Sequence, residues 1–210
     1  MKNQLYLLGL LSSVSIVMVI GRVAGVENLG GIFLIWNLFL AWLPLGLAYL
    51  VGDMWRQRYI GRRGVIVGVG IWLLFFPNAP YLITDLIHLK AAPDHLIWYD
   101  ALMSFSFALS GLLTGLYSLL KVHRLVEKIW NSLIAWVTVS GSLVLSSYGV
   151  YLGRFGRWNS WDIVTHPFSL VRYSVSNLHD PLAIKLTVAF SFAMLVIYGA
   201  FWLFTSKSLR

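Results

Sequence analysis

Residues 64–90 read GVIVGVGIWLLFFPNAPYLITDLIHLK. The first 21 of them contain no acidic or basic residue, whereas the last six include Asp85, His88 and Lys90. An α-helix rises about 1.5 Å per residue, so about 20 residues cross a hydrocarbon core that is roughly 30 Å thick. The segment is therefore long enough and apolar enough to span a membrane.

The same pattern recurs along the chain. Stretches of 19 to 25 residues without Asp, Glu, Lys or Arg cover 3–21, 29–52, 64–84, 101–120, 129–153 and 186–206. Because 59% of the 210 residues are hydrophobic and 11% are charged, too little polar surface remains for a water-soluble globule. A membrane β-barrel needs shorter strands that alternate in polarity, and these runs are continuously apolar. The sequence predicts one all-α domain over 1–210, a polytopic membrane helical bundle with about six transmembrane helices at 4–22, 29–51, 64–90, 98–120, 130–153 and 181–204.

The basic residues indicate how this bundle lies in the membrane. With six spans, the two termini share one side, and that side holds ten Lys and Arg against two acidic residues, a balance of +8. The other side holds six of each. Because short loops rich in Lys and Arg stay cytoplasmic, we expect both termini in the cytoplasm. Arg56-Gln57-Arg58 and Arg62-Arg63 suit anionic lipid headgroups, and no nucleic acid is expected because no basic domain lies outside the membrane.

The third helix carries an unusual proline pair. Pro77 and Pro80 remove backbone donors and clash with the preceding turn, so we expect a kink or a break there. If the helix is broken, Asn78 is well placed to cap a new segment whose amides favour anions. Tyr81, Asp85 and His88 follow at spacings of four and three and share one face. The alternative is a simple kink, with Asp85 paired to an arginine.

Further polar groups are predicted at the same end of the bundle. Asp100 lies near the start of the fourth helix, and Arg154 and Arg157 lie at the end of the fifth. The connection 154–180 contains segments too short to cross, which we expect to lie along the membrane interface. Equal numbers of acids and bases favour ion pairs among these residues. The candidate substrate-binding residues are Asn78, Tyr81, Asp85, His88, Asp100, Arg154 and Arg157.

Several functions fit these groups. We favour a site for an anionic lipid or lipid-linked substrate, since arginine binds phosphate bidentately. Asp85 with His88, and Asp162 with His166, are weak candidates for a metal site. A small-solute transporter or channel subunit would need a wet path. The spans lack ionisable residues at depth, although Asn37 near the middle of the second span is polar. A scaffold or a homo-oligomer could use the paired glycines Gly64/Gly68, Gly111/Gly115 and Gly149/Gly153.

The sequence shows no cofactor-binding or catalytic motif. No nucleophile elbow, phosphate-binding loop or dinucleotide fingerprint is present, and the absence of cysteine excludes disulfides and thiolate chemistry. The cofactor is therefore unknown, and whether the protein is an enzyme stays uncertain.

Three segments carry a family resemblance: Phe76–Leu86 (FPNAPYLITDL), Trp98-Tyr99-Asp100, and Ser147–Arg154 (SYGVYLGR). They resemble the bacterial integral-membrane family catalogued as domain of unknown function 1361. The resemblance covers nearly the whole chain and is most specific at Pro-Asn-Ala-Pro-Tyr. It implies a multi-pass protein of the bacterial cytoplasmic (plasma) membrane, and it supplies no activity.

Overall fold

The computed structural model describes residues 2–26, 31–87 and 94–207. In these residues every regular element is a helix. The elements are α1 (Lys2–Val26), α2 (Phe33–Arg56), α3 (Arg62–Phe75), α4 (Asn78–Thr84), the 3₁₀ helix η2 (Asp94–Leu96), α5 (Ile97–Ile129), α6 (Ser132–Gly156), α7 (Asp162–Thr165), α8 (Pro167–Ser176) and α9 (Pro181–Lys207).

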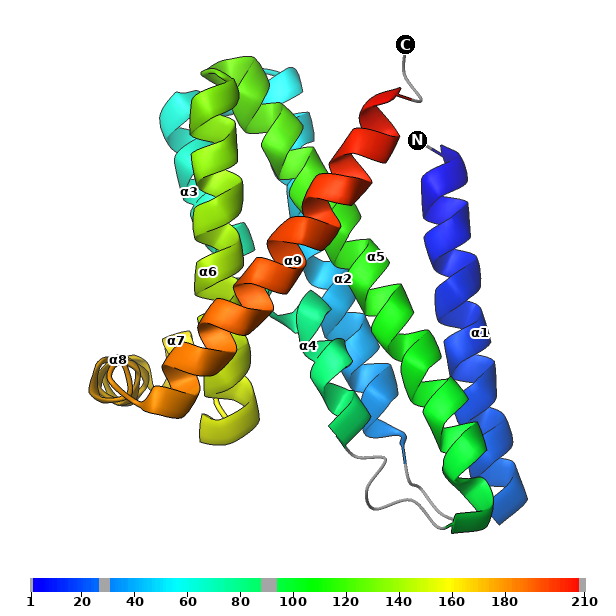
Figure 1. Cartoon of the computed structure of the whole chain (residues 1–210). Coiled ribbons are helices and arrows are strands. Elements are labelled where there is room, and N and C mark those ends of the chain that lie inside the picture. Colours follow the sequence, from blue (N-terminus) through cyan, green and yellow to red (C-terminus); the bar gives the residue numbers. More distant parts are fainter. Residues whose placement is uncertain (1, 27–30, 88–93, 208–210) are drawn as a thin grey trace.

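The expected membrane-spanning bundle is confirmed. Six helical segments of the described chain are long and apolar enough to cross a membrane, with bounds Asn3–Gly25, Phe33–Arg56, Arg62–Ile87, Ile97–Ile129, Ser132–Gly156 and Pro181–Ser206. In Figure 1, α1 begins and α9 ends at the top of the bundle, which we call the termini end. The opposite end, near which α8 lies, is called the α8 end.

The bundle is organised around α5. This helix packs against α1, α2, α4 and α6, and α9 packs mainly against α6 (Figure 1). One buried cluster joins α3, α5, α6 and α9 through side chains such as Trp72, Leu119, Leu143 and Tyr198. A second cluster around Phe107 joins α1, α2, α4 and α5. The heavily buried α5 is the scaffold on which the other helices are placed.

The fourth span is longer than the sequence predicts. The helix continues past residue 120 to Ile129, so 121–128 is helical and does not form the expected loop. In this extension Val122 and Val126 are buried, whereas Arg124 and Lys128 are not. Charges therefore occupy one face of a continuing amphipathic helix, which a count of charge-free residues cannot detect.

The third span is kinked at the proline pair, as predicted. α3 ends at Phe75, α4 begins at Asn78, and Figure 1 shows the two segments running in different directions. Pro77 keeps helical dihedral angles (φ −57°, ψ −25°), and the amide of Tyr81 still donates to the Pro77 carbonyl at 3.0 Å. The chain therefore bends without unwinding.

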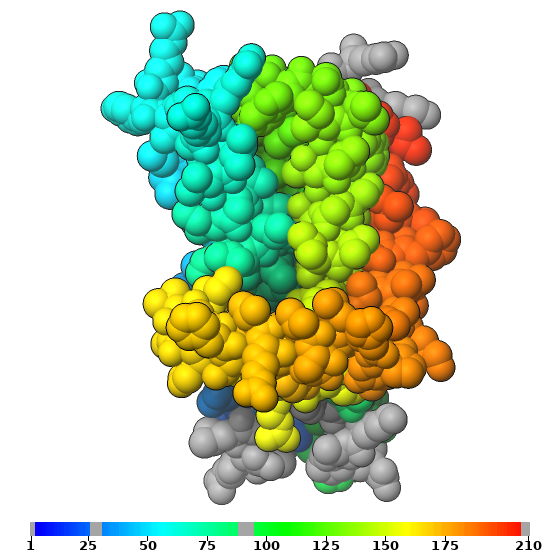
Figure 2. Space-filling model, turned by 90° about the vertical axis from the view of Figure 1, so that its left-hand side faces the viewer, coloured from blue at the N-terminus to red at the C-terminus, as the bar shows by residue number. Residues whose placement is uncertain are grey.

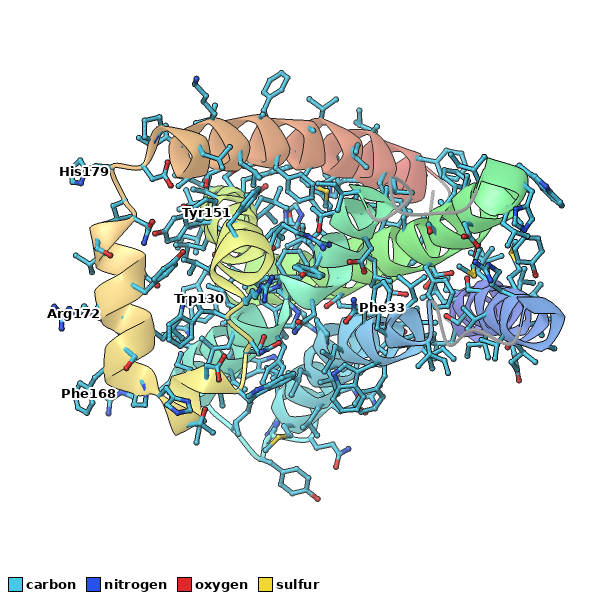
Figure 3. The ribbon with its side chains drawn as sticks, turned by 90° about the horizontal axis from the view of Figure 1, so that it is seen from below. Phe33, Trp130, Tyr151, Phe168, Arg172 and His179 are labelled. Atoms are coloured by element: carbon cyan, nitrogen blue, oxygen red, sulfur yellow. The ribbon has the colours of Figure 1, made fainter. Side chains whose placement is uncertain are left out.

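The connection predicted over 154–180 contains two short helices. α6 extends to Gly156, and α7 and α8 follow. In Figure 1 α8 is seen end-on, and in Figure 3 it runs along the edge of the bundle, so it lies across the direction of the spans. On α8 the apolar side chains of Phe168, Val171 and Val175 are exposed, as are those of Val164 in α7 and Leu178 after α8. Such exposed apolar side chains are typical of a helix that lies in a membrane interface.

Candidate functional site

A cavity of about 560 Å³ lies between α2, α3, α4 and α6, next to α7 and α8. Figure 2 shows a hollow between α3 and α6, with α7 and α8 lying across its lower end. The volume is within the range of about 300–1,000 Å³ that is usual for small-molecule sites. Its lining is Asn37, Leu40, Leu73, Leu74, Pro77, Asn78, Tyr81, Leu145, Gly149, Leu152, Gly153, Arg157, Trp158, Asn159, Ser160, Ile163 and Leu170.

Close helix packing shapes the wall of this cavity. A Cβ atom on Gly149 would lie 2.9 Å from Pro77 Cγ, and one on Gly153 would lie 3.1 Å from the ring of Tyr81. Side chains at these two positions would push α4 away from α6. The two glycines therefore allow the kinked segment to approach α6 and form one side of the cavity.

Asn78 lies in the cavity wall, but its role differs from the one expected. It is the first residue of α4 and caps no amide of that helix. Its side-chain Nδ2 instead donates to the Phe75 carbonyl at 2.9 Å and to Ser160 Oγ at 3.0 Å. Near the kink the amides of Ala79 and Tyr81 donate to the carbonyls of Phe76 and Pro77, so these two amides are not available to an anion. Asn78 closes the end of α3 and ties it to the connection before α7.

Asp85 is buried in a polar network beside the cavity, with a side chain that is 2% exposed. Arg154 Nη2 donates to Asp85 Oδ1 at 2.5 Å, and Asn37 Nδ2 donates to Asp85 Oδ2 at 2.9 Å. Arg154 also donates to Thr84 Oγ1 at 2.7 Å. A charge buried at this depth requires such partners. This pairing confirms the alternative interpretation of the third span, a kink with Asp85 paired to an arginine.

Arg154 makes polar contacts within this network. Its guanidinium lies over the ring of Tyr81, with Cζ 4.5 Å from the ring centroid. Tyr81 faces the cavity, whereas Arg154 and Asp85 lie behind it and are absent from the lining. The Asp85–Arg154 ion pair therefore supports the cavity wall through the contact of Arg154 with Tyr81. The opposite charges of Asp85 and Arg154 offset each other.

Arg157 is a charged residue of the cavity lining. It follows the last residue of α6 in the left-handed conformation (φ 56°), where the chain turns, and this exposed residue lines the cavity. Within the part of the chain that the structure describes, Arg157 has no ion pair, and no acidic residue lines the cavity. The electrostatic environment therefore favours an anion.

Other predicted site residues lie elsewhere. Asp100 accepts a hydrogen bond from Arg22 Nε at 2.6 Å, in a pair whose side chains are 14% and 5% exposed, and this bond joins α1 to α5. His88 falls outside the described residues. Tyr99 donates to the Met18 carbonyl at 2.8 Å and strengthens the same junction. The start of α5 is thus fixed to α1 and is separate from the cavity.

The metal candidates are partly described. Asp162 Oδ2 accepts the Asn159 amide, and His166 Nδ1 lies 3.8 Å from Asp162 Oδ1 with a side chain that is 67% exposed. Both oxygens of Asp85 bind protein donors. Among residues 2–26, 31–87 and 94–207, no group of three or more His, Asp and Glu is arranged to hold a metal ion.

Four polar residues that line the cavity were not among the candidate site residues predicted from the sequence. Asn37 gave a signal, because it is an amide near the middle of an otherwise apolar span. Trp158, Asn159 and Ser160 stand in a connection with no sequence signal for a cavity. The indole N–H of Trp158 is buried without an acceptor among the described atoms. It is a donor for which a bound acceptor would provide a partner.

No match was found among curated proteins or among solved structures. A family model described as "Protein of unknown function (DUF1361)" matches residues 36–197, which contain the kink, the cavity lining and most of the bundle. Since this match covers well over half of the chain, the protein belongs to the DUF1361 family and is a membrane-spanning helical bundle.

Proposed function

We propose that this protein binds an anionic lipid, or the anionic end of a lipid-linked substrate, in the cavity between α3 and α6. The observation that carries the proposal is that Arg157 lines a largely apolar cavity and has no ion pair among the described residues. An apolar lining favours a hydrocarbon, and an arginine without a carboxylate favours a phosphate or another oxyanion. An amphiphilic anion satisfies both.

The lining residues are ordered in a way that suits such a ligand. Arg157, Asn159 and Ser160 belong to the connection at the α8 end, whereas Leu73 and Leu145 lie further along their helices toward the termini end. A headgroup would therefore bind beside the connection, with its chain directed into the bundle. Trp158 adds an N–H donor near the headgroup.

The orientation in the membrane is part of the proposal. The balance of +8 at the termini end supports a cytoplasmic position for both termini. The cavity mouth then lies at the extracytoplasmic surface of a bacterial plasma membrane, where α8 rests in the interface. Headgroups of the outer leaflet would lie beside Arg157.

A transport path is less well supported. Asn37, the polar residue at depth in α2, donates to the buried Asp85, and Asp85 is closed off by Arg154. A hydrated pathway would have to disrupt this network. The network instead favours a structural role for Asn37, which lines the cavity and is held by Asp85.

The test compares two arginines. Purified protein is titrated with dioleoyl phosphatidic acid and with dioleoyl phosphatidylcholine, and bound lipid is counted by native mass spectrometry. We expect Arg157→Gln to weaken phosphatidic acid binding about tenfold, because a charge-assisted contact contributes about 1.5–3 kcal/mol. The matched control is Arg172→Gln, because Arg172 points away from the bundle in Figure 3. Equal binding by the two variants would refute the proposal.

A further inference from the structure

A smaller hollow, which we call the termini-end hollow, lies between the first turns of α3, the end of α5 and the first turns of α6. Its volume is about 250 Å³, and Figure 2 shows α3 beside α6 at this end of the bundle. The termini-end hollow shares no lining residue with the cavity that contains Arg157. Its lining is Val65, Ile66, Val69, Val126, Trp130, Ile134 and Thr138.

The lining of the termini-end hollow is apolar. Thr138 brings a hydroxyl to it, but this hydroxyl donates to the Ile134 carbonyl at 2.8 Å within α6. Trp130 stands at the junction of α5 and α6 and is half-buried. A tryptophan in such a place is typical of the boundary between hydrocarbon and headgroups. The hollow therefore favours a hydrocarbon chain whose polar end lies at the membrane surface.

Arg62 stands at the surface end of this hollow. It is the first residue of α3, and Val65, Ile66 and Val69 follow it by three, four and seven residues, so they share its face of the helix. Arg62 is exposed, and in the part of the chain that the structure describes it forms no ion pair. A cationic residue therefore lies one helical turn from the apolar lining, on the side of the membrane surface.

The electrostatic surroundings of Arg62 favour an anion. The termini end carries the balance of +8. Of its two acidic residues, Asp53 pairs with Arg56 at 3.0 Å, and Glu127 is absent from the lining of the hollow. Basic residues at a membrane surface attract anionic headgroups, and a guanidinium can bind two oxygens of a phosphate. An arginine above an apolar hollow matches a phospholipid that carries a net negative charge.

We propose that the termini-end hollow binds an anionic glycerophospholipid, with its phosphate at Arg62 and one acyl chain between α3 and α6. The volume of about 250 Å³ lies below the range of about 300–1,000 Å³ that encloses a whole small-molecule ligand, so the hollow holds part of one chain. The rest of the lipid stays in the bilayer. This site is separate from the cavity at Arg157 and does not depend on which side of the membrane the termini end faces.

The first experiment removes the charge. Purified protein is titrated with dioleoyl phosphatidylglycerol and with dioleoyl phosphatidylcholine, and bound lipids are counted by native mass spectrometry. We expect Arg62→Gln to weaken phosphatidylglycerol binding about fivefold and to leave phosphatidylcholine binding unchanged, because one basic residue at an anionic membrane surface contributes about 1 kcal/mol.

The matched control is Lys128→Gln, which removes one positive charge from the same end of the bundle. Lys128 lies two residues after Val126, or about 200° around α5, so it faces away from the hollow. Equal weakening of phosphatidylglycerol binding by Arg62→Gln and Lys128→Gln would show a general effect of the basic residues and would overturn the site.

The double variant Arg62→Gln/Arg157→Gln separates this site from the cavity at Arg157. Losses of phosphatidylglycerol binding that add up in the double variant would support two independent sites. A loss that occurs with Arg157→Gln alone would overturn the second site and leave the proposed function intact. A loss that occurs with Arg62→Gln alone would support the second site and count against the proposed function.

The second experiment locates the acyl chain. A phosphatidylglycerol that carries a diazirine on one acyl chain is photo-crosslinked to the protein, and the adducts are mapped by peptide mass spectrometry. We expect adducts around Ile66 and Ile134. Ile134→Trp should fill the hollow and abolish them, whereas Leu133→Trp should retain them, because Leu133 is 74% exposed and lies outside the lining. Adducts that persist in Ile134→Trp, or that spread evenly over all helices, would overturn the inference.

Discussion

At the residue scale, the most consequential pair is Asp85 with Arg154. Removing one partner of a buried pair leaves an uncompensated charge and costs about 3–5 kcal/mol. We predict that Asp85→Ala lowers the thermal midpoint of the purified protein strongly, measured by differential scanning fluorimetry. Asp85→Asn should be milder, because an amide still accepts from Asn37 or Arg154.

The control is the pair between Asp53 and Arg56, whose side chains are 53% and 71% exposed. Exposed ion pairs contribute little to stability, so Asp53→Ala should leave the midpoint nearly unchanged. If Asp85→Ala and Asp53→Ala have equal midpoints, the role assigned to the buried network is wrong.

Asp180 provides a second residue-level prediction, on pH. Its carboxylate accepts hydrogen bonds from the Tyr151 hydroxyl at 2.5 Å and from the Leu182 amide at 2.8 Å. The Tyr151 bond chiefly lowers the pKa of Asp180 below its ordinary value of 3.8. Since the folded-state pKa is the lower one, the stabilisation is full above the unfolded-state pKa and is lost as the pH falls through the folded-state pKa.

We therefore expect the melting temperature of the wild type to be higher than that of Tyr151→Phe at neutral pH. This difference in melting temperature should shrink below about pH 4. Thermal melts recorded from about pH 7 down to about pH 2 measure this difference. A constant difference over the whole range would show that Tyr151 contributes through packing alone.

At the scale of elements, α4 is held against α5 by glycine. A Cβ on Gly111 would lie 2.8 Å from the Ala79 carbonyl oxygen, and one on Gly115 would lie 2.9 Å from Ala79 Cβ. We predict that Gly111→Ala destabilises the protein by about 1–3 kcal/mol through overpacking. The measurement is the denaturation midpoint in mixed micelles.

Gly46→Ala is the matched control, because it faces open space and alanine is the better helix former by about 1 kcal/mol. It should be neutral or stabilising. A destabilisation of equal size in both variants would show that the glycine contacts with α4 are unimportant.

The spacing of the paired glycines does not tell which helix each glycine packs against. Gly111, Gly115, Gly149 and Gly153 contact α4 or the segment around it within the same chain, and Gly68 contacts Val51 of α2. The spacing predicts close approach of backbones, and the structure identifies the partner helix. A homo-oligomer stays a prediction that crosslinking can test.

At the scale of the whole molecule, the orientation can be tested directly, because the chain contains no cysteine. Single cysteines at Thr165 and Tyr59, both exposed and at opposite ends, would report the side of each end. We expect a membrane-impermeant maleimide added to intact cells to label Thr165→Cys and not Tyr59→Cys. The reverse pattern would place the cavity mouth in the cytoplasm.

The sequence by itself determined the membrane class, the six spans and the kink, because these depend on local composition, on helix rise and on the geometry of proline. It also indicated that Asp85 needs a cationic partner, since a lone charge is costly in a low-dielectric interior. Only the tertiary structure decided that Arg154 is the partner and that Arg157 has no ion pair within residues 2–26, 31–87 and 94–207. That choice depends on how α4, α6 and the connection before α7 approach one another, which neither spacing nor composition specifies.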